Sequence, residues 1–273
     1  MKTQIILRKV HYAFSAFLCT ACLVSCNDWL KPEPLSFYSP ENTYVTKEGL
    51  EGALVSCRAM IRPEFIGNNS YACTELMTSD VAVAGNIVAQ TLKNFEIQLK
   101  PGAYGDSQIG TFWSKGYSAI QKANTIISRV QAADEITEND KNTILAEGYF
   151  HRSYWYYKLV NQFGDVPFID KEVTTPKLDF YSHTRSSILK RLREDMMFAT
   201  RYLPESAPHG AVSKAAGNHL LAKICLACCD FDGAVAATTA VIDHSQHKLI
   251  FLIGRISILL KIWKASSWLR IND

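Results

Sequence analysis

The chain of 273 residues carries 29 basic and 26 acidic side chains, and 48% of its residues are hydrophobic, so it is long enough to bury a substantial core. Three of the basic residues lie in 1–25, and four lie in 249–273 together with one acid, which leaves 22 basic and 25 acidic residues in 26–248. This balance provides no clustered positive surface, and we therefore exclude nucleic acid as a partner.

The N-terminal residues have the pattern of a secretory leader. Residues 1–11 are basic, and residues 12–25 carry no charge. An apolar run of this length is short for a membrane span but is typical of a signal peptide. Leu23-Val24-Ser25-Cys26 resembles a lipobox, so we predict a lipoprotein signal peptide over 1–25 and lipidation of Cys26. An ordinary signal peptide, or an anchoring helix with a chance cysteine, is the alternative.

The next segments alternate between irregular and helical patterns. Residues 26–44 contain three prolines and predict an irregular tether. Thr46 then caps an apolar stripe with 3–4 spacing that predicts a helix ending at Pro63. Residues 64–104 have little periodicity and scattered glycines, so we predict a loop-rich insertion.

Helical periodicity returns after the insertion and continues almost to the C-terminus. The first helical segment covers residues 106–133, and the second begins at Thr137 and Asp140 and ends at Gly164 and Pro167. Three further segments cover 184–203, 213–229 and 231–242, and Asp230 separates the last two. Small residues in the final pair predict close helix contacts like those of tetratricopeptide repeats. We predict a mostly α fold of tetratricopeptide-like antiparallel helix pairs with a loop-rich insertion.

One of these helices is crowded with aromatic residues around Glu147 and Arg152. A platform on which sugar rings stack is one interpretation, but rings at this density more often fill a core, and we interpret most of them so. The residues from Phe163 to Pro167 predict a structural turn, in which Gly164 takes the left-handed helical conformation and Pro167 prevents continuation.

Residues 144–169, ILAEGYFHRSYWYYKLVNQFGDVPFI, carry a resemblance to a known family. Together with the start of the predicted mature chain at Cys26, the helix after Thr46, the Trp113-to-Ile127 helix and the Ser213-to-Lys223 helix, they resemble the SusD/RagB family of nutrient-binding outer-membrane lipoproteins. The resemblance covers about residues 22–248, and we assign 45–248 to a SusD-like N-terminal helical domain.

The resemblance implies a protein at the outer membrane, facing the cell surface. Such a protein binds nutrient, in most cases an oligosaccharide or other glycan, and passes it to a TonB-dependent (SusC-like) transporter. Ligand groups are expected in the insertion, where Tyr71, Asp80, Asn86 and Tyr104 offer rings, a carboxylate and an amide. A docking subunit of the transporter complex without its own ligand site, and a non-functional truncated fragment, are the alternatives.

Enzymatic and metal chemistry find little support in the sequence. No nucleophile elbow, HExxH motif, P-loop or GxGxxG motif is present, so we predict no enzyme, no cofactor and no metal. Cys225, Cys228 and Cys229 are spaced to share one helical face, but only His219 lies near as a fourth zinc ligand. A disulfide between Cys57 and Cys73 is compatible with an exported protein, but the sequence alone does not decide whether it forms.

Residues 249–273 depart from the family pattern, because they are basic and apolar. They have two interpretations: an amphipathic helix on the membrane surface, or the product of a frameshift or truncation.

Overall fold

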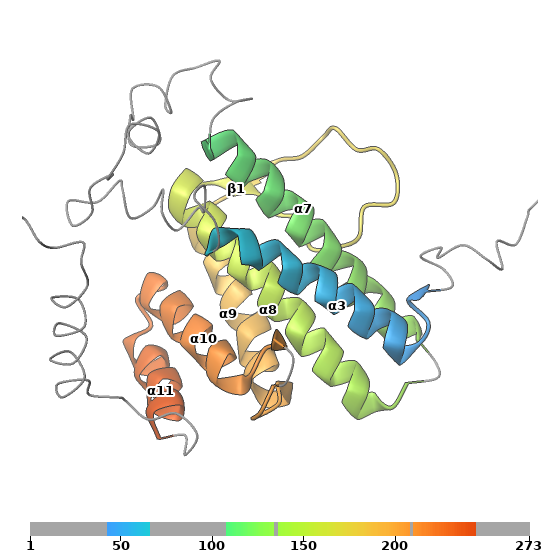
Figure 1. Ribbon diagram of the computed structural model, residues 1–273. Helices are drawn as coiled ribbons and strands as arrows, with labels where there is room; N and C mark the ends of the chain where they lie inside the picture. The colour runs from blue at the N-terminus through green and yellow to red at the C-terminus, as the bar shows by residue number, and fades with distance from the viewer. Residues whose placement is uncertain (1–42, 66–107, 134–135, 208–209, 244–273) are drawn as a thin grey trace, which may run out of the picture. The chain divides into compact units, whose positions relative to one another are not determined.

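The computed structural model of the protein describes residues 43–65, 108–133, 136–207 and 210–243 (Figure 1). The described residues form six α-helices: α3 (Lys47–Ile61), α7 (Gln108–Arg129), α8 (Glu138–Phe163), α9 (Arg185–Tyr202), α10 (Lys214–Ala227) and α11 (Phe231–Ile242). They also contain the 3-10 turns η1 (Arg62–Glu64) and η3 (Val130–Ala132) and the antiparallel strands β1 (Val166–Pro167) and β2 (Ser182–His183). The prediction of a mostly α fold is confirmed.

The helices pack side by side in chain order, as tetratricopeptide-like folds do. From α7 onward, each helix contacts the next one along the chain, and α3 lies across α7 and α8 (Figure 1). The α8 helix is central, since it contacts α3, α7 and α9.

Helix starts follow local sequence. Five helices begin after a side chain whose oxygen accepts a hydrogen bond, at 3.0 to 3.3 Å, from the backbone N–H three residues later. These capping residues satisfy one of the orphan donors of each first turn; they are Thr46, Thr137, Thr184, Ser213 and Asp230.

Helix ends agree with the predicted breakers, with one correction. Pro63 lies in η1 directly after α3, and α8 stops before Gly164. Gly164 has φ 75° as predicted, but its ψ of −121° is not the left-handed helical value. This backbone conformation is open to glycine and strained for other residues, and it directs the chain into β1.

Glycines allow the helices to approach closely. A Cβ at Gly116 of α7 would lie 3.1 Å from the Leu159 side chain of α8, and one at Gly217 of α10 would lie 2.6 Å from Leu203, at the end of α9. Small residues thus lie against large ones between α7 and α8 and between α9 and α10. For the final pair, α10 and α11 contact each other and Ala234 and Ala237 of α11 are buried.

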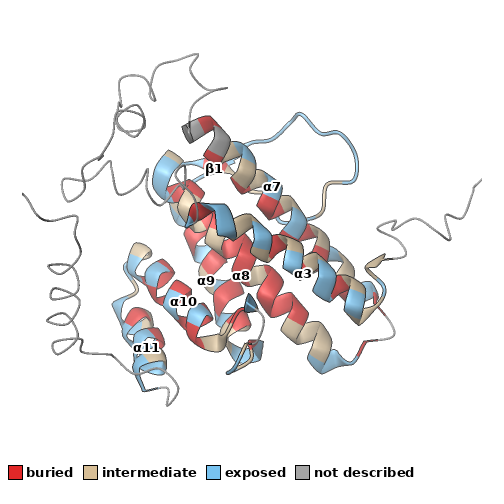
Figure 2. Cartoon of the chain, in the orientation of Figure 1, coloured by how far each residue is buried: buried red, intermediate tan, exposed pale blue. Residues whose placement is uncertain are grey.

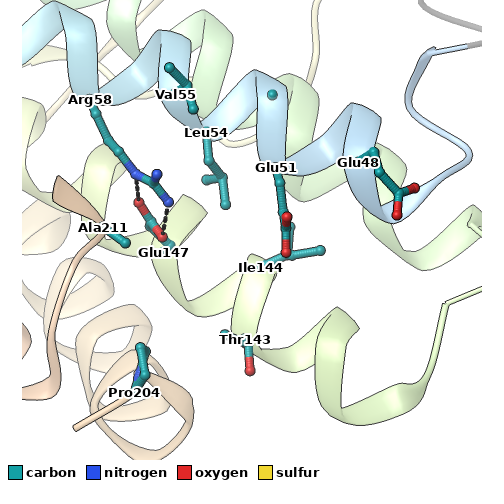
Figure 3. A pocket seen from close by; sticks show the side chains of 11 residues that line it. Glu48, Glu51, Leu54, Val55, Arg58, Thr143, Ile144, Glu147, Pro204 and Ala211 are labelled. Atoms are coloured by element: carbon teal, nitrogen blue, oxygen red, sulfur yellow. Dashed lines mark hydrogen bonds and ion pairs between the residues drawn. The ribbon is translucent and has the colours of Figure 1, made fainter. Parts of the chain in front are cut away.

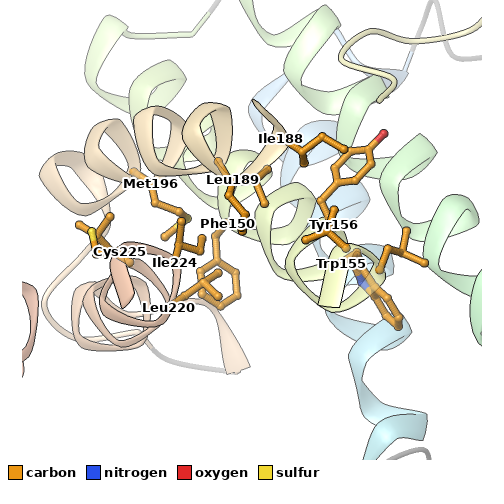
Figure 4. Packing of buried hydrophobic residues seen from close by; sticks show 14 of the residues in the cluster. Phe150, Trp155, Tyr156, Ile188, Leu189, Met196, Leu220, Ile224 and Cys225 are labelled. Atoms are coloured by element: carbon orange, nitrogen blue, oxygen red, sulfur yellow. The ribbon is translucent and has the colours of Figure 1, made fainter. Parts of the chain in front are cut away.

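The core is centred on α8, α9 and α10. Trp155 and Tyr156 are fully buried, and Phe150, Leu189 and Ile224 pack in the same cluster (Figure 4). The interpretation of the α8 rings as core residues is thus confirmed for Phe150, Trp155 and Tyr156. Figure 2 shows how strongly burial falls from α8 to α11.

The predicted face of three cysteines is wrong. Cys225 is buried in α10, whereas Cys228 is the residue after the helix and Cys229 is exposed with φ 59°. The helix ends too early to align the three thiols.

Several predictions fall on residues outside the described ranges. These are the leader 1–25, Cys26, nearly all of the tether, all of the insertion after Phe65 and the tail 249–273.

Candidate functional site

A groove lies between α3, α8 and the segment that precedes α10 (Figure 3). Its volume is about 470 Å³. The residues that line it combine charged and small apolar side chains; they are Glu48, Glu51, Gly52, Leu54, Val55, Arg58, Thr143, Ile144, Glu147, Pro204 and Ala211.

Arg58 of α3 and Glu147 of α8 form the strongest polar contact of this groove. Arg58 Nε donates to Glu147 Oε1 at 2.6 Å and Nη2 donates to Oε2 at 2.9 Å, a bidentate geometry (Figure 3). His151 Nε2 lies 3.4 Å from the same Oε1. Glu147 therefore links α3 to α8 and is fully engaged by its neighbours.

Electrostatics keep this carboxylate ionised. Burial disfavours the charge, but the hydrogen bonds from His151 and Arg58 outweigh it, so the pKa of Glu147 lies below its ordinary value. The hydrogen bond from Arg58 to Glu147 correspondingly raises the pKa of Arg58. A carboxylate of lowered pKa that is held by an arginine is suited to structural pairing rather than to general acid catalysis.

The groove offers polar contacts without an aromatic surface. The carboxylates of Glu48 and Glu51 could accept hydrogen bonds from sugar hydroxyls. Of the described residues that line the groove, none is aromatic, so it lacks the ring faces on which sugars stack. By this chemistry it is at most a peripheral contact for a glycan.

A second polar centre lies inside the helices around Arg152. Its guanidinium donates to Asp195 Oδ2 at 2.5 Å, to the Asp170 carbonyl at 3.0 Å and to Asn124 Oδ1 at 3.3 Å, and it lies 4.9 Å from the Tyr149 ring centroid. Burial raises the pKa of Asp195 against the opposing effect of Arg152. This centre is sealed, because both charged side chains are at least 96% buried, and it serves the fold rather than a ligand.

The same helices hold the turn after α8. The Tyr156 hydroxyl accepts from Ile169 N–H at 2.6 Å, and Asn124 Nδ2 donates to the Ile169 carbonyl at 2.7 Å. Asp165 Oδ1 accepts from Arg185 N–H at 2.8 Å, at the start of α9. The prediction that the Phe163-to-Pro167 segment is structural agrees with these contacts.

Two partners in these networks were not predicted from the sequence. They are Arg58, the partner of Glu147, and Asp195, the partner of Arg152. The available signal was that a charge on the buried face of a helix requires a partner. Nothing local in the sequence indicates which residue that partner is.

The predicted ligand residues Tyr71, Asp80, Asn86 and Tyr104 lie outside the described residues. The structure therefore neither brings them together nor separates them.

Metal and thiol chemistry have little basis in the part of the chain that the structure describes. No group of three or more His, Cys, Asp or Glu side chains there is arranged to hold a metal ion. Cys57 is a buried free thiol whose pKa burial raises to about 12. Its suggested disulfide partner, Cys73, is not among the described residues.

Among the helices described, none combines the length and the apolar character needed to span a bilayer.

Comparison with known proteins decides the family. Residues 50–226 match the model of the SusD-like family whose description is "Starch-binding associating with outer membrane". The chain belongs to the SusD-like family. The match runs from within α3 to within α10, so it includes the groove residues other than Glu48, the Arg152 centre and the turn after α8.

Individual relatives agree with this assignment. The chain is 29% identical over 243 residues to SusD-like protein P2 of Formosa agariphila, covering 87% of this chain and 47% of that protein. A SusD superfamily protein from Bacteroides vulgatus has a similar fold, with a TM-score of 0.64 and 17% identity, covering 76% of this chain and 46% of that one. Surface glycan-binding protein A from Bacteroides uniformis gives a TM-score of 0.62 and 18% identity, covering 75% and 48%. The chain thus spans about half the length of these SusD-like proteins.

Proposed function

We propose that the chain is a surface-exposed lipoprotein of the outer membrane that binds nutrient glycan and passes it to a TonB-dependent, SusC-like transporter. The observation that carries this proposal is the family match over residues 50–226, whose description names both starch binding and the outer membrane. Binding without catalysis is the activity proposed, and no cofactor is required.

The membrane attachment in this proposal is covalent lipid on Cys26. Two or three acyl chains on one lipidated cysteine bind a bilayer stably, since each buried CH₂ contributes about 0.8 kcal/mol. Labelled palmitate should enter the full chain and should not enter the Cys26→Ala variant. Equal labelling of both chains would contradict the anchor.

The glycan site in this proposal lies in the insertion, at Tyr71, Asp80, Asn86 and Tyr104. Tyrosine rings stack on sugar rings, while a carboxylate and an amide hold hydroxyl groups. The first residue of the insertion is Glu64, the last residue of η1, which is buried and accepts from Lys158 Nζ at 2.8 Å and from the Tyr154 hydroxyl. The structure thus anchors one end of the insertion to α8, which supports a site built on a fixed base.

Titration calorimetry of the full chain against a panel of starch, laminarin and other soluble glycans tests the proposal. We expect saturable binding of at least one glycan and no release of reducing ends. Absence of binding across the panel, with intact helical circular dichroism, would favour the docking-subunit alternative. Release of reducing ends would instead support the hypothesis that the protein is an enzyme that cleaves glycans.

A further inference from the structure

The loop between β1 and β2 is long and exposed. It contains 14 residues, from Phe168 to Tyr181, and has no helix or strand of its own. Figure 1 shows it in yellow, extending out past α7, and Figure 2 shows that most of it is exposed. Connections of this length without secondary structure are uncommon in compact folds, and most of them serve a function.

The first half of the loop is held on α7. Glu172 Oε2 accepts from Arg129 Nε at 2.8 Å, and the Glu172 N–H donates to Ser128 Oγ at 3.1 Å. Gln121 Nε2 donates to the Val173 carbonyl at 3.2 Å. The loop therefore has a fixed base at the C-terminal part of α7.

Beyond this base, residues 174–181 form what we call the loop tip, and the tip exposes apolar side chains. Leu178 is 98% exposed, Tyr181 is 79% exposed and Phe180 is 39% exposed. None of the three belongs to either hydrophobic cluster of the described helices. A group of large apolar side chains outside the core marks a surface that contacts another body.

The base of this loop lies beside the point where the predicted tether joins the helices. The Arg129 guanidinium, which pairs with Glu172, also lies 5.6 Å from the centroid of the Tyr44 ring. Tyr44 is the last residue of the tether that begins at Cys26. The 17 residues from Cys26 to Asn42 extend at most about 60 Å, so a bilayer that holds Cys26 has a high effective concentration at this end of the helices.

The side chains of the tip favour lipid over sugar. A sugar site needs open ring faces and several convergent polar groups. Lys177 Nζ lies 5.5 Å from the centroid of the Phe180 ring, on one of its faces, and Leu178 has no hydrogen-bonding group. Leucine, tyrosine and lysine are instead side chains that proteins place at a lipid surface.

We propose that the loop tip contacts the bilayer to which Cys26 is anchored. Leu178 reaches the boundary of the acyl chains, while the Tyr181 ring and the Lys177 ammonium lie among the headgroups. The backbone of the tip stays outside the hydrocarbon, because its N–H and C=O groups have no partners there. This contact depends on the lipid anchor of the proposed function, and it adds a second point of attachment that orients the helices on the membrane.

The environment-sensitive amino acid dansylalanine, in place of Leu178, tests this contact in the full lipidated chain. The chain is reconstituted into vesicles of phosphatidylethanolamine and phosphatidylglycerol, with or without bromine on the acyl chains. We expect the emission to shift to shorter wavelengths in the vesicles and to be quenched by the brominated lipid. The same probe in place of Val235, which is 65% exposed on α11, is the control and should show neither change.

A substitution at the neighbouring ring sharpens the test. Tyr181→Asp should lower the quenching at position 178 about tenfold, because it places a charge at the lipid boundary. Val235→Asp is the matched control and should leave the quenching at position 178 unchanged. Equal quenching in the two variants would overturn the proposal.

Palmitate labelling of the same samples separates the contact from the anchor. A chain that incorporates palmitate and is not quenched at position 178 would overturn the contact and leave the anchor standing. A chain that does not incorporate palmitate would overturn both. A shift of the probe with soluble laminarin, in the absence of vesicles, would make the tip a glycan site and would also overturn the proposal.

Discussion

The helices α8 and α11 illustrate two extremes within one array. Of the 26 residues of α8, 13 are buried, and they include Glu147, His151 and Arg152. Of the 12 residues of α11, two are buried, and both are alanines. The α8 helix is held on several sides and its buried charges are paired, whereas α11 is held on one side through small residues.

This difference explains why the family motif lies in α8. A position in the centre of the array must satisfy several neighbours at once, so its side chains are specified by packing and by buried polar partners. The motif residues thereby identify the fold without marking a ligand site. The predictions below test this contrast, beginning with the largest effect.

Replacing Arg152 by methionine should lower the free energy of unfolding by about 3–5 kcal/mol, because the buried carboxylate of Asp195 then loses the guanidinium that pairs with it. Urea denaturation followed by circular dichroism measures this. The matched control is Arg191→Met, which removes the other cation near Asp195, at 3.4 Å; this side chain is 48% exposed, and the cost should stay below about 1 kcal/mol. Equal costs would show that the Arg152 centre is not a buried network.

The Glu147→Gln variant should lose about 2 kcal/mol at pH 7, the contribution of hydrogen bonds to a charged group. The pKa of Glu147 is lowered in the folded protein, so its contribution is present above the unfolded value of about 4.3 and is lost as the pH falls through the folded pKa. Stability of the unmodified chain should therefore fall more steeply than that of the variant below about pH 5. Denaturation at a series of pH values checks this, with the 65% exposed Glu194→Gln as control. Parallel pH profiles for the chain and Glu147→Gln would refute the pairing.

Tyr156→Phe should cost about 1.5 kcal/mol, because the Ile169 N–H loses its acceptor beside a buried ring. Thermal unfolding is the measurement. Tyr181→Phe removes the same hydroxyl from a side chain that is 79% exposed and should have no effect. An unchanged thermal stability of Tyr156→Phe would mean that the turn after α8 does not depend on this hydrogen bond.

Within α11, Asp230→Ala should cost about 1 kcal/mol, since it removes the N-cap acceptor of Gly233 N–H and the partner of Arg193. Asp232→Ala, in the first turn of the same helix, removes only an interaction with the helix dipole and should cost about 0.3 kcal/mol. Hydrogen exchange of the α11 amides resolves both effects. A larger loss from Asp232→Ala would contradict the assignment of the cap.

The contrast also explains what could be predicted from the sequence. Helix starts at Thr46, Thr137 and Thr184 were predictable, because a capping side chain acts within three residues of itself. The Arg58–Glu147 and Arg152–Asp195 pairs were not, since they join residues 89 and 43 positions apart, and packing alone selects the partner. The candidate ligand residues came from the resemblance to the family, and their geometry stays a prediction.

Glycan affinity in two variants tests most directly the central claim that α8 supports the fold while the insertion binds ligand. Calorimetry would compare Tyr71→Ala/Tyr104→Ala, in the insertion, with Tyr156→Phe, in α8, using the best glycan of the panel. We predict that the first variant loses at least about tenfold in affinity, as stacking contributions of roughly 1–3 kcal/mol imply, while the second keeps the affinity of the unmodified chain. Unchanged binding by the insertion variant, with a loss in folded Tyr156→Phe, would contradict the account.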